Sequence, residues 1–273
     1  MAGKSLLFIV AIITFYSCSK NSITGRSQLK LLPESELQTM ATQQYQQFLT
    51  QNKVVGSTAS GNYGRDAEMV RRVGQKLSKA VEDYFKSKGI QNQLKGYQWE
   101  YNLVENKEAN AWCMPGGKIV VYTGLLPYTK NETALAIVLG HEITHAVLQH
   151  GNERMSQGLL QQFGAVALSA ALSQKPEATQ NLFLQSYGVG STVLGTLPFS
   201  RKDESEADHY GLIWAALAGY DPQEAVPFWQ RMAQSGGQKP PEFLSDHPSD
   251  QNRIEQIKQW MPEALKYYHQ NGK

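Results

Sequence analysis

The chain has 273 residues, 41% of them hydrophobic and 18% charged, and a formal net charge of +2. This length allows one large domain or two small ones, and either can bury a sizeable core. The near-neutral charge gives no reason to expect nucleic acid as a partner. The two cysteines, Cys18 and Cys113, cannot build a disulfide scaffold.

The N-terminus resembles an export signal. An apolar run over 5–16 follows one lysine and is too short to span a bilayer comfortably. Cys18 comes next, as in a bacterial lipoprotein signal, although Phe15 and Tyr16 depart from the residues preferred there. We therefore expect a signal peptide over 1–17, a lipid on Cys18 that anchors the protein to a membrane, and a periplasmic location. An ordinary signal peptide and an uncleaved anchor are the alternatives.

The first half of the mature chain predicts helices, a strand and a hairpin. Apolar residues recur at helical spacing in two segments and alternate with polar residues in a third. A Pro-Gly-Gly turn between two short apolar runs favours a hairpin. The predicted elements are a tether and helix within 18–60, with the helix over 33–49, a second helix over 66–88, a strand over 97–104 and a hairpin over 109–126.

A buried helix is predicted over 131–151, because nearly every position within it is apolar and Gly151 can end it in a left-handed conformation. His141 and His145 are four residues apart and share one face. This spacing lets two imidazoles bind one zinc ion, with Glu142 placed to accept a proton from zinc-bound water. Two histidines hydrogen-bonded in a core are the alternative, but a metal satisfies all three buried polar groups together.

A third zinc ligand must come from another element. A helix that begins at Ser200 carries Glu204 and Asp208 four residues apart, on a face that continues through the small residue Gly211. Glu204 can bind zinc, and Asp208 can accept a hydrogen bond from a ligand imidazole. Glu206 is expected to point to solvent or to Arg201. An acidic, solvated helix start is the alternative interpretation.

The remaining segments predict further helices and irregular connections. Their apolar residues recur at helical spacing, and proline marks helix starts and ends. The expected elements are a covering helix over 153–172, a flap or packed connection over 173–198, a helix after Asp221-Pro222, and a last helix over 249–261 that Pro262 breaks. His150, His209 and His269 belong to no motif, and we expect them to be structural or exposed.

The chain resembles the gluzincin zinc metallopeptidases that include HtpX, BepA and the CAAX prenyl endopeptidases, and it is most similar to their soluble periplasmic members. The resemblance covers about 21–265 and implies a zincin-like metallopeptidase domain over 18–273. The implied fold is α+β and mostly α-helical, with a small sheet whose edge strand borders the active-site cleft. The matching motifs are His141-Glu142-x-x-His145, Ser200-Arg201-x-x-Glu204-x-Glu206-Ala207-Asp208, Asn110-Ala111-x-x-x-Pro115-Gly116-Gly117, Ile23-Thr24-Gly25-Arg26, and His247-Pro248 with Arg253.

The resemblance also implies roles for single residues. His141, His145 and Glu204 would hold one Zn²⁺ per chain. Glu142 would be the general base. Asp208 would not bind the metal itself but would hold a ligand imidazole by a hydrogen bond.

The resemblance assigns two further parts of the site. His247 would lie over the zinc, either as a fourth ligand in a latent state or as a stabiliser of the tetrahedral intermediate. The substrate-holding edge strand would consist of Lys118, Ile119, Val120 and Val121, although the residues alone fit an ordinary core hairpin equally well.

The expected function is that of a zinc metalloendopeptidase that cleaves unfolded or misassembled envelope proteins in protein quality control. A periplasmic holdase or assembly factor with a latent protease site is the alternative from another class. A zinc hydrolase of non-peptide amides is a third interpretation.

Overall fold

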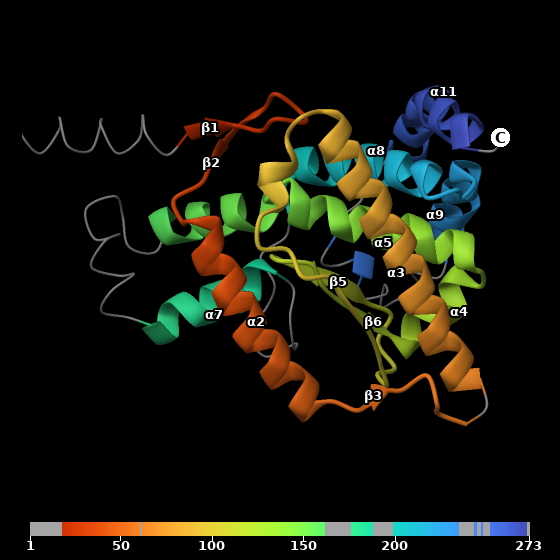
Figure 1. Ribbon diagram of the computed structural model, residues 1–273, viewed down its shortest axis with the longest axis horizontal. Coiled ribbons are helices and arrows are strands. Elements are labelled where there is room, and N and C mark those ends of the chain that lie inside the picture. The colour runs from red at the N-terminus through yellow and green to blue at the C-terminus, as the bar shows by residue number, and fades with distance from the viewer. Residues whose placement is uncertain are drawn as a thin grey trace, which may run out of the picture.

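The computed structural model describes residues 18–60, 62–161, 176–187, 199–234, 243–244, 247 and 252–271. Helices surround a small β-sheet in this part of the chain (Figure 1), which is the predicted α+β architecture with helix predominating. The predicted signal peptide, residues 162–172 of the predicted covering helix, and residues 173–175 and 188–198 of the predicted flap lie outside the described residues. Within them, no helix combines the length and the apolar character that crossing a bilayer requires.

The central sheet has four strands in the order β3-β4-β6-β5. β4 and β6 are parallel, whereas β5 and β6 form an antiparallel hairpin. The hairpin turns at Gly116 and Gly117, whose φ angles of 80° and 82° favour glycine. The predicted hairpin is therefore confirmed. The strands are β3 (Val54–Val55), β4 (Glu100–Val104), β5 (Ala111–Met114) and β6 (Lys118–Tyr122).

β6 is an inner strand, so the prediction that it forms the substrate-holding edge is wrong. Its residues Lys118, Ile119, Val120 and Val121 pair with β4 on one side and with β5 on the other. The partner β4 comes from an earlier segment, and the local sequence pattern does not reveal this parallel pairing. Among the described strands, β5 is the outermost one on this side of the sheet.

Helices cover both faces of the sheet. Because successive side chains of a strand point to opposite faces, they pack in different hydrophobic cores. Ala111 and Cys113 of β5 pack with helices α3 (Asn62–Ser87) and α5 (Glu132–Val147). Trp112 and Met114 pack on the other face. That face is covered by α2 (Glu34–Gln51), α7 (Pro176–Ser186) and the helical residues 150–161.

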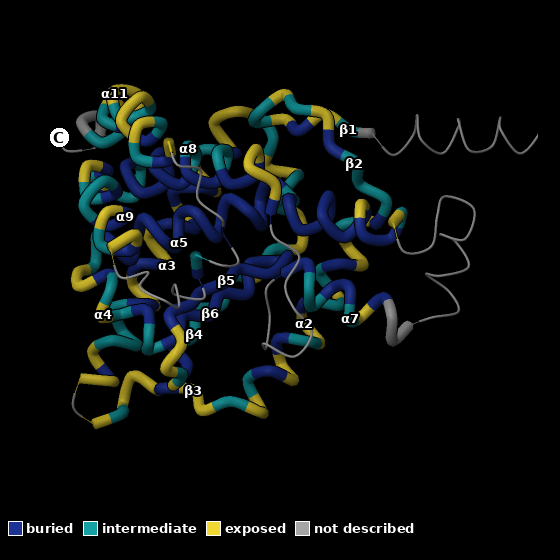
Figure 2. The backbone as a smooth tube through the Cα atoms, turned by 180° about the vertical axis from the view of Figure 1, so that it is seen from behind, coloured by how far each residue is buried: buried dark blue, intermediate teal, exposed yellow. Residues whose placement is uncertain are grey.

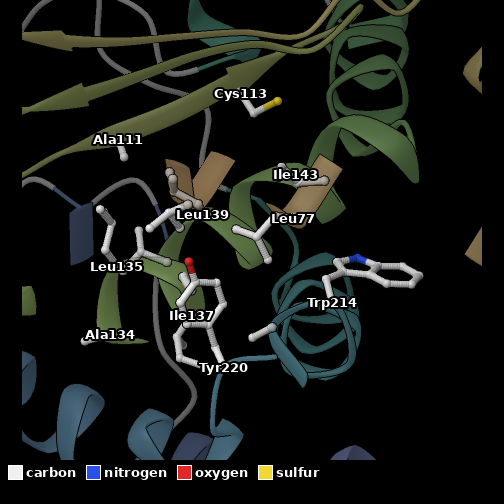
Figure 3. Close-up of a cluster of buried hydrophobic side chains, with 14 of the residues drawn as sticks. Leu77, Ala111, Cys113, Ala134, Leu135, Ile137, Leu139, Ile143, Trp214 and Tyr220 are labelled. Carbon is white, nitrogen blue, oxygen red and sulfur yellow. The ribbon is translucent and has the colours of Figure 1, made fainter. Parts of the chain in front are cut away.

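α5 and α8 (Arg201–Leu217) lie side by side in the larger core (Figure 1) and approach closely at two glycines. A Cβ atom on Gly211 would lie 2.8 Å from the main-chain nitrogen of His141, and one on Gly140 would lie 2.7 Å from the Gly211 oxygen. The expectation that the small face of α8 packs against another helix is confirmed. Figure 3 shows Leu77, Ile143 and Trp214 in this core, and Figure 2 shows α5 buried along its length.

α11 (Arg253–Asn271) continues through Pro262, so the prediction that this proline ends the helix is wrong. Proline removes one main-chain donor and disfavours a helix interior. Here the second half of α11 packs on the core, because Ala264 is buried and the Tyr267 ring lies 6.4 Å from that of Tyr84. Tertiary packing therefore outweighs the local preference.

The other elements are short or peripheral. A two-stranded sheet precedes α2 and lies near the end of α5, where Asn21 and Gln28 donate side-chain hydrogen bonds to the Leu148 carbonyl at 3.2 and 3.0 Å. The remaining bounds are β1 (Cys18–Lys20), β2 (Ser27–Leu29), α4 (Leu126–Thr129), α9 (Ala225–Gln234), η1 (Gln91–Leu94), η2 (Thr123–Leu125) and η3 (Pro222–Glu224).

Candidate active site

The ends of α5 determine how its histidines are presented. The Asn131 side chain caps the start by accepting a hydrogen bond from the Ala134 main chain at 2.8 Å. The helix ends at Val147, and Gln149 takes the left-handed conformation with φ 60°. The predicted end at Gly151 is therefore wrong. Residues 150–161 are helical again, and the break turns the chain so that His150 meets His145.

Four buried side chains converge beside this helix. They are His141 and His145 of α5, Glu204 of α8, and His247, and their potential ligand atoms lie within 4.8 Å of one another. The two Nε2 atoms of His141 and His145 are 3.0 Å apart. Glu204 Oε1 lies 3.4 Å from His145 Nε2 and 2.9 Å from His247 Nδ1. The structure thus brings together the three predicted ligands and His247.

Asp208, one turn after Glu204 on α8, fixes the first imidazole. Its Oδ1 atom lies 2.9 Å from His141 Nδ1 and accepts a hydrogen bond from Arg253 at 2.6 Å. The Arg253 guanidinium stacks 3.3 Å above the Trp229 ring. Because a carboxylate only accepts, His141 carries its proton on Nδ1 and directs the Nε2 lone pair toward the cluster.

The second imidazole has a longer chain of partners, which the sequence analysis missed. His145 Nδ1 lies 3.0 Å from His150 Nδ1, and His150 Nε2 lies 3.0 Å from Glu206 Oε2. Glu206 in turn binds Arg26, so the expectation that Glu206 points to solvent or to Arg201 is wrong. In one continuous helix His145 and His150 would not share a face. Only the break at Gln149 brings them together.

The side chains of the cluster fit a zinc ion. Glu206 accepts from His150, so His150 Nδ1 accepts from His145, and both ligand histidines point a lone pair into the 3.0 Å gap between them. Glu204 Oε2 is buried and makes no hydrogen bond to a described residue. Without a cation, the lone pairs of the two imidazoles and Glu204 Oε2 would be left unsatisfied. Two imidazoles and a carboxylate are a set of ligands typical of zinc.

The charge states also suit a metal. Burial lowers the pKa of both His141 and His145, which keeps the imidazoles neutral. Burial acts to raise the pKa of Glu204, but His247 and His141 outweigh it, so that pKa is lowered and the carboxylate is ionised. Neutral imidazole and ionised carboxylate are the forms that bind metal.

A small pocket opens beside the cluster. It is lined by Glu142 and His247 and by the edge strand residues Ala111, Trp112 and Cys113. Glu142 Oε1 lies 3.4 Å from His247 Nε2. The cavity volume is about 10 Å³, enough for roughly one water molecule. Burial raises the pKa of the Cys113 thiol, which fits a packed thiol and not a nucleophile.

The model of peptidase family M48 matches residues 71–261, and the chain belongs to this family. The mitochondrial metalloendopeptidase OMA1 of Schizosaccharomyces pombe is 38% identical over 169 residues, which are 61% of this chain and 48% of that protein. Human OMA1 is 33% identical over 278 residues, 97% of this chain and 50% of that protein. The chain spans about half the length of these two relatives.

A bacterial relative is less similar. The β-barrel assembly-enhancing protease of Escherichia coli is 28% identical over 162 residues, 57% of this chain and 33% of that protein. Family and relatives, together with the donor cluster, fit the predicted class, a zinc metalloendopeptidase. They do not support the resemblance to a soluble periplasmic type. The predicted periplasmic lipoprotein location is wrong, since relatives that match most of the chain are named mitochondrial.

Proposed function

We propose that this chain is a zinc-dependent endopeptidase that cleaves extended segments of unfolded or misassembled proteins in protein quality control. The observation that carries the proposal is the buried convergence of His141, His145 and Glu204, whose ligand atoms lie within 4.8 Å of one another. Glu142, the residue beside the first ligand, lines the adjoining pocket. Membership of a peptidase family supports the same reaction.

In this proposal His141, His145 and Glu204 hold the metal. Bound zinc supplies a Lewis acid that lowers the pKa of water and polarises a peptide carbonyl. Glu142 accepts the proton of the attacking water and later donates it to the leaving amine. The buried surroundings of Glu142, which is 3% exposed, exclude bulk water from this transfer.

The edge of β5 that faces away from β6 is suited to hold the substrate. Tyr122 donates a main-chain hydrogen bond to the Asn110 carbonyl at 3.0 Å. In an antiparallel pair, every second residue directs its main-chain groups toward the partner strand, and the residues between them direct theirs away from it. The Ala111 carbonyl and both main-chain groups of Cys113 therefore point away from β6. The Ala111 amide is already bound to the Asn110 side chain at 2.8 Å.

An extended peptide can add to this edge as a further strand. Such a strand would run beside the pocket that Glu142 and His145 line, with its carbonyl groups near the metal ligands. Folded proteins rarely offer an unpaired extended segment, which is why we propose unfolded or misassembled substrates.

His247 fits the role of a latent-state ligand better than that of an oxyanion donor. Its Nδ1 atom lies 3.2 Å from His141 Nε2 and 2.9 Å from Glu204 Oε1, among the atoms that would hold the metal. The rings of Phe243 and Phe199 stack on the His247 imidazole, with distances between ring centroids of 4.7 and 5.4 Å. The small cavity volume supports the same closed state.

The test is the substitution Glu142→Gln, which keeps the shape of the side chain and removes the base. We expect cleavage of casein to fall by at least about 10²-fold while one zinc per chain remains bound. Glu68→Gln on the exposed surface of α3 is the matched control and should cleave normally. Normal turnover by Glu142→Gln would remove this assignment.

The closed site also favours one alternative, a holdase with a latent protease site. The same assay separates the two functions when a chelator is added and aggregation of a disordered client is followed in parallel. Cleavage that depends on zinc supports the enzyme. Suppression of aggregation that survives both the chelator and Glu142→Gln, without cleavage, supports the holdase.

A further inference from the structure

We propose that Arg26, Glu206 and His150 form a relay that positions the zinc ligand His145, which makes the N-terminal motif Ile23-Thr24-Gly25-Arg26 part of the metal site. The inference rests on the proposed role of His145 as a ligand. Nothing in the proposed reaction uses these three residues directly, so they are positioning residues and not catalytic ones.

The first step of the relay is the contact between two imidazoles. His150 is fully buried, and its Nδ1 atom lies 3.0 Å from His145 Nδ1. Its other nitrogen lies 3.0 Å from Glu206 Oε2. Because the carboxylate can only accept, His150 accepts from His145, and this fixes the ligand tautomer with Nε2 free for the metal.

The second step is the cation that holds Glu206. Arg26 Nε donates to Glu206 Oε1 at 2.8 Å and Nη2 donates to Oε2 at 3.1 Å, which is a bidentate pair. The same guanidinium binds Asp203 at 2.6 Å and Glu153 at 2.8 Å. His150, Asp203 and Glu206 lie close enough together to hold a metal ion, but the Arg26 guanidinium already binds the two carboxylates of this group.

The electrostatics agree with this assignment. Burial acts to lower the pKa of Arg26, but its three carboxylate partners, Glu206, Asp203 and Glu153, reverse that effect and raise it. Removing Arg26 therefore leaves Glu206 without its cation in a half-buried position.

The N-terminal motif is built to deliver this arginine. The Asn21 side chain accepts hydrogen bonds from the main chain of Ile23 at 2.9 Å and of Thr24 at 3.2 Å. Gly25 then turns the chain with φ 70°. The same Asn21 side chain donates to the Leu148 carbonyl, three residues after His145. The tight turn is thus bound to the end of the zinc helix, with Arg26 directed at α8.

Each of the two zinc ligands of α5 is therefore held by a carboxylate that an arginine binds, but the series of contacts is one residue longer for His145 than for His141. His141 reaches the Asp208–Arg253 pair directly. His145 reaches the Glu206–Arg26 pair through one additional imidazole. The N-terminal segment supplies the last member of the longer support, although it lies far from α5 in the sequence.

The test measures zinc affinity by competition with a chelator, together with the visible absorption of the Co²⁺-loaded chain, so that it does not depend on activity. We expect Arg26→Gln and His150→Leu to weaken zinc binding by about tenfold or more. The Co²⁺ spectrum should shift because the geometry of the ligand field changes. Arg26→Lys and His150→Gln, which keep the charge or both hydrogen-bonding functions, should recover most of the affinity.

The matched control is Arg231→Gln. Arg231 is similarly half-buried, binds Glu224 at 2.8 Å and reaches the carbonyls of Tyr128 and Thr129, but it has no contact with the metal cluster. We expect it to lower the Tm of the metal-free and zinc-loaded chain alike, with unchanged zinc affinity. Arg26→Gln should instead reduce the rise in Tm that zinc produces.

A double variant decides whether the residues act in series. If they do, Arg26→Gln combined with His150→Leu loses no more zinc affinity than His150→Leu alone. Additive losses, or zinc affinity and a Co²⁺ spectrum unchanged in Arg26→Gln, would overturn the relay. Failure of the proposed function is a separate outcome, because it appears as normal cleavage by Glu142→Gln or as no zinc bound to the unsubstituted chain.

Discussion

Polar side chains buried at the centre of this molecule are held in defined pairs, and their spacing in the sequence reveals only some of the pairs. His141, His145 and Glu142 lie on one helix, where the period of the helix alone predicts which groups meet. Glu204 and Asp208 could be predicted in the same way on α8. His150 and Arg26 could not, because their contacts depend on a helix break at Gln149 and on a distant turn.

His247 is the residue whose removal distinguishes a latent site from an active one. We expect His247→Ala to raise cleavage of an unfolded substrate several-fold, since it removes an imidazole that lies 2.9 Å from Glu204 Oε1 among the metal ligands. The measurement is kcat/KM on casein, with the Tm of the variant as the check that it still folds. A loss of activity with zinc retained would instead assign His247 to the oxyanion, and no change in activity or zinc affinity would discard both roles.

Glu34 provides a test of pH dependence away from the site. Both carboxylate oxygens are buried, and burial raises the pKa of Glu34 to about 7 against the effects of Lys30 and Gln38. The folded state therefore favours the protonated form. The contribution of Glu34 to the free energy of unfolding is therefore most favourable below a pH of about 4.5. It falls as the pH rises to about 7 and stays reduced above that.

Glu34→Gln should accordingly stabilise the fold by on the order of 2 kcal/mol at pH 8 and by much less at pH 4.5. Urea unfolding in the presence of a chelator measures this without a contribution from zinc. Glu36→Gln, at an exposed position of the same helix turn, is the control. A gain that is equal at both pH values would refute the raised pKa.

At the scale of elements, the sequence predicted those that are defined by their own residues. The apolar period gave α2 and α3 to within a few positions, and the Pro-Gly-Gly turn gave the hairpin of β5 and β6. The errors have a common cause. Pro262 stays inside α11, and β6 is inner and not outer, because partners from distant segments pack on them.

The close crossing of α5 and α8 is the element-level feature that sets the distance between the zinc ligands. Gly211→Ala would place a Cβ atom 2.8 Å from the His141 main-chain nitrogen, and main chain cannot move aside as a side chain can. We expect a cost of about 1–3 kcal/mol in unfolding free energy. Zinc affinity should also fall, because the helices that carry His141 and Glu204 must separate.

Gly56→Ala is the matched control for that substitution. It lies in an exposed loop, where the nearest atom to a new Cβ would be the Thr58 hydroxyl at 3.8 Å. Chelator competition and urea unfolding on both variants give the comparison. Unchanged zinc affinity in a destabilised Gly211→Ala variant would show that helix separation does not set the site.

Across the whole molecule, segments from the start, middle and end of the chain contribute to one buried polar centre. Arg26 comes from the N-terminal turn, the histidines from α5, the carboxylates from α8, and Arg253 from α11. The resemblance to a known family implied the α+β class, but neither it nor the periodicity of the sequence revealed this convergence, which depends on how the helices are arranged around the sheet (Figure 1).

The central claim is that one zinc ion is held by His141, His145 and Glu204. Anomalous scattering at the zinc edge from crystals of the full chain tests it most directly. We predict one strong peak at about 2.0–2.2 Å from the Nε2 atoms of both histidines and from a Glu204 oxygen. A peak among His150, Asp203 and Glu206, or zinc-loaded crystals with no peak between the two helices, would contradict the account.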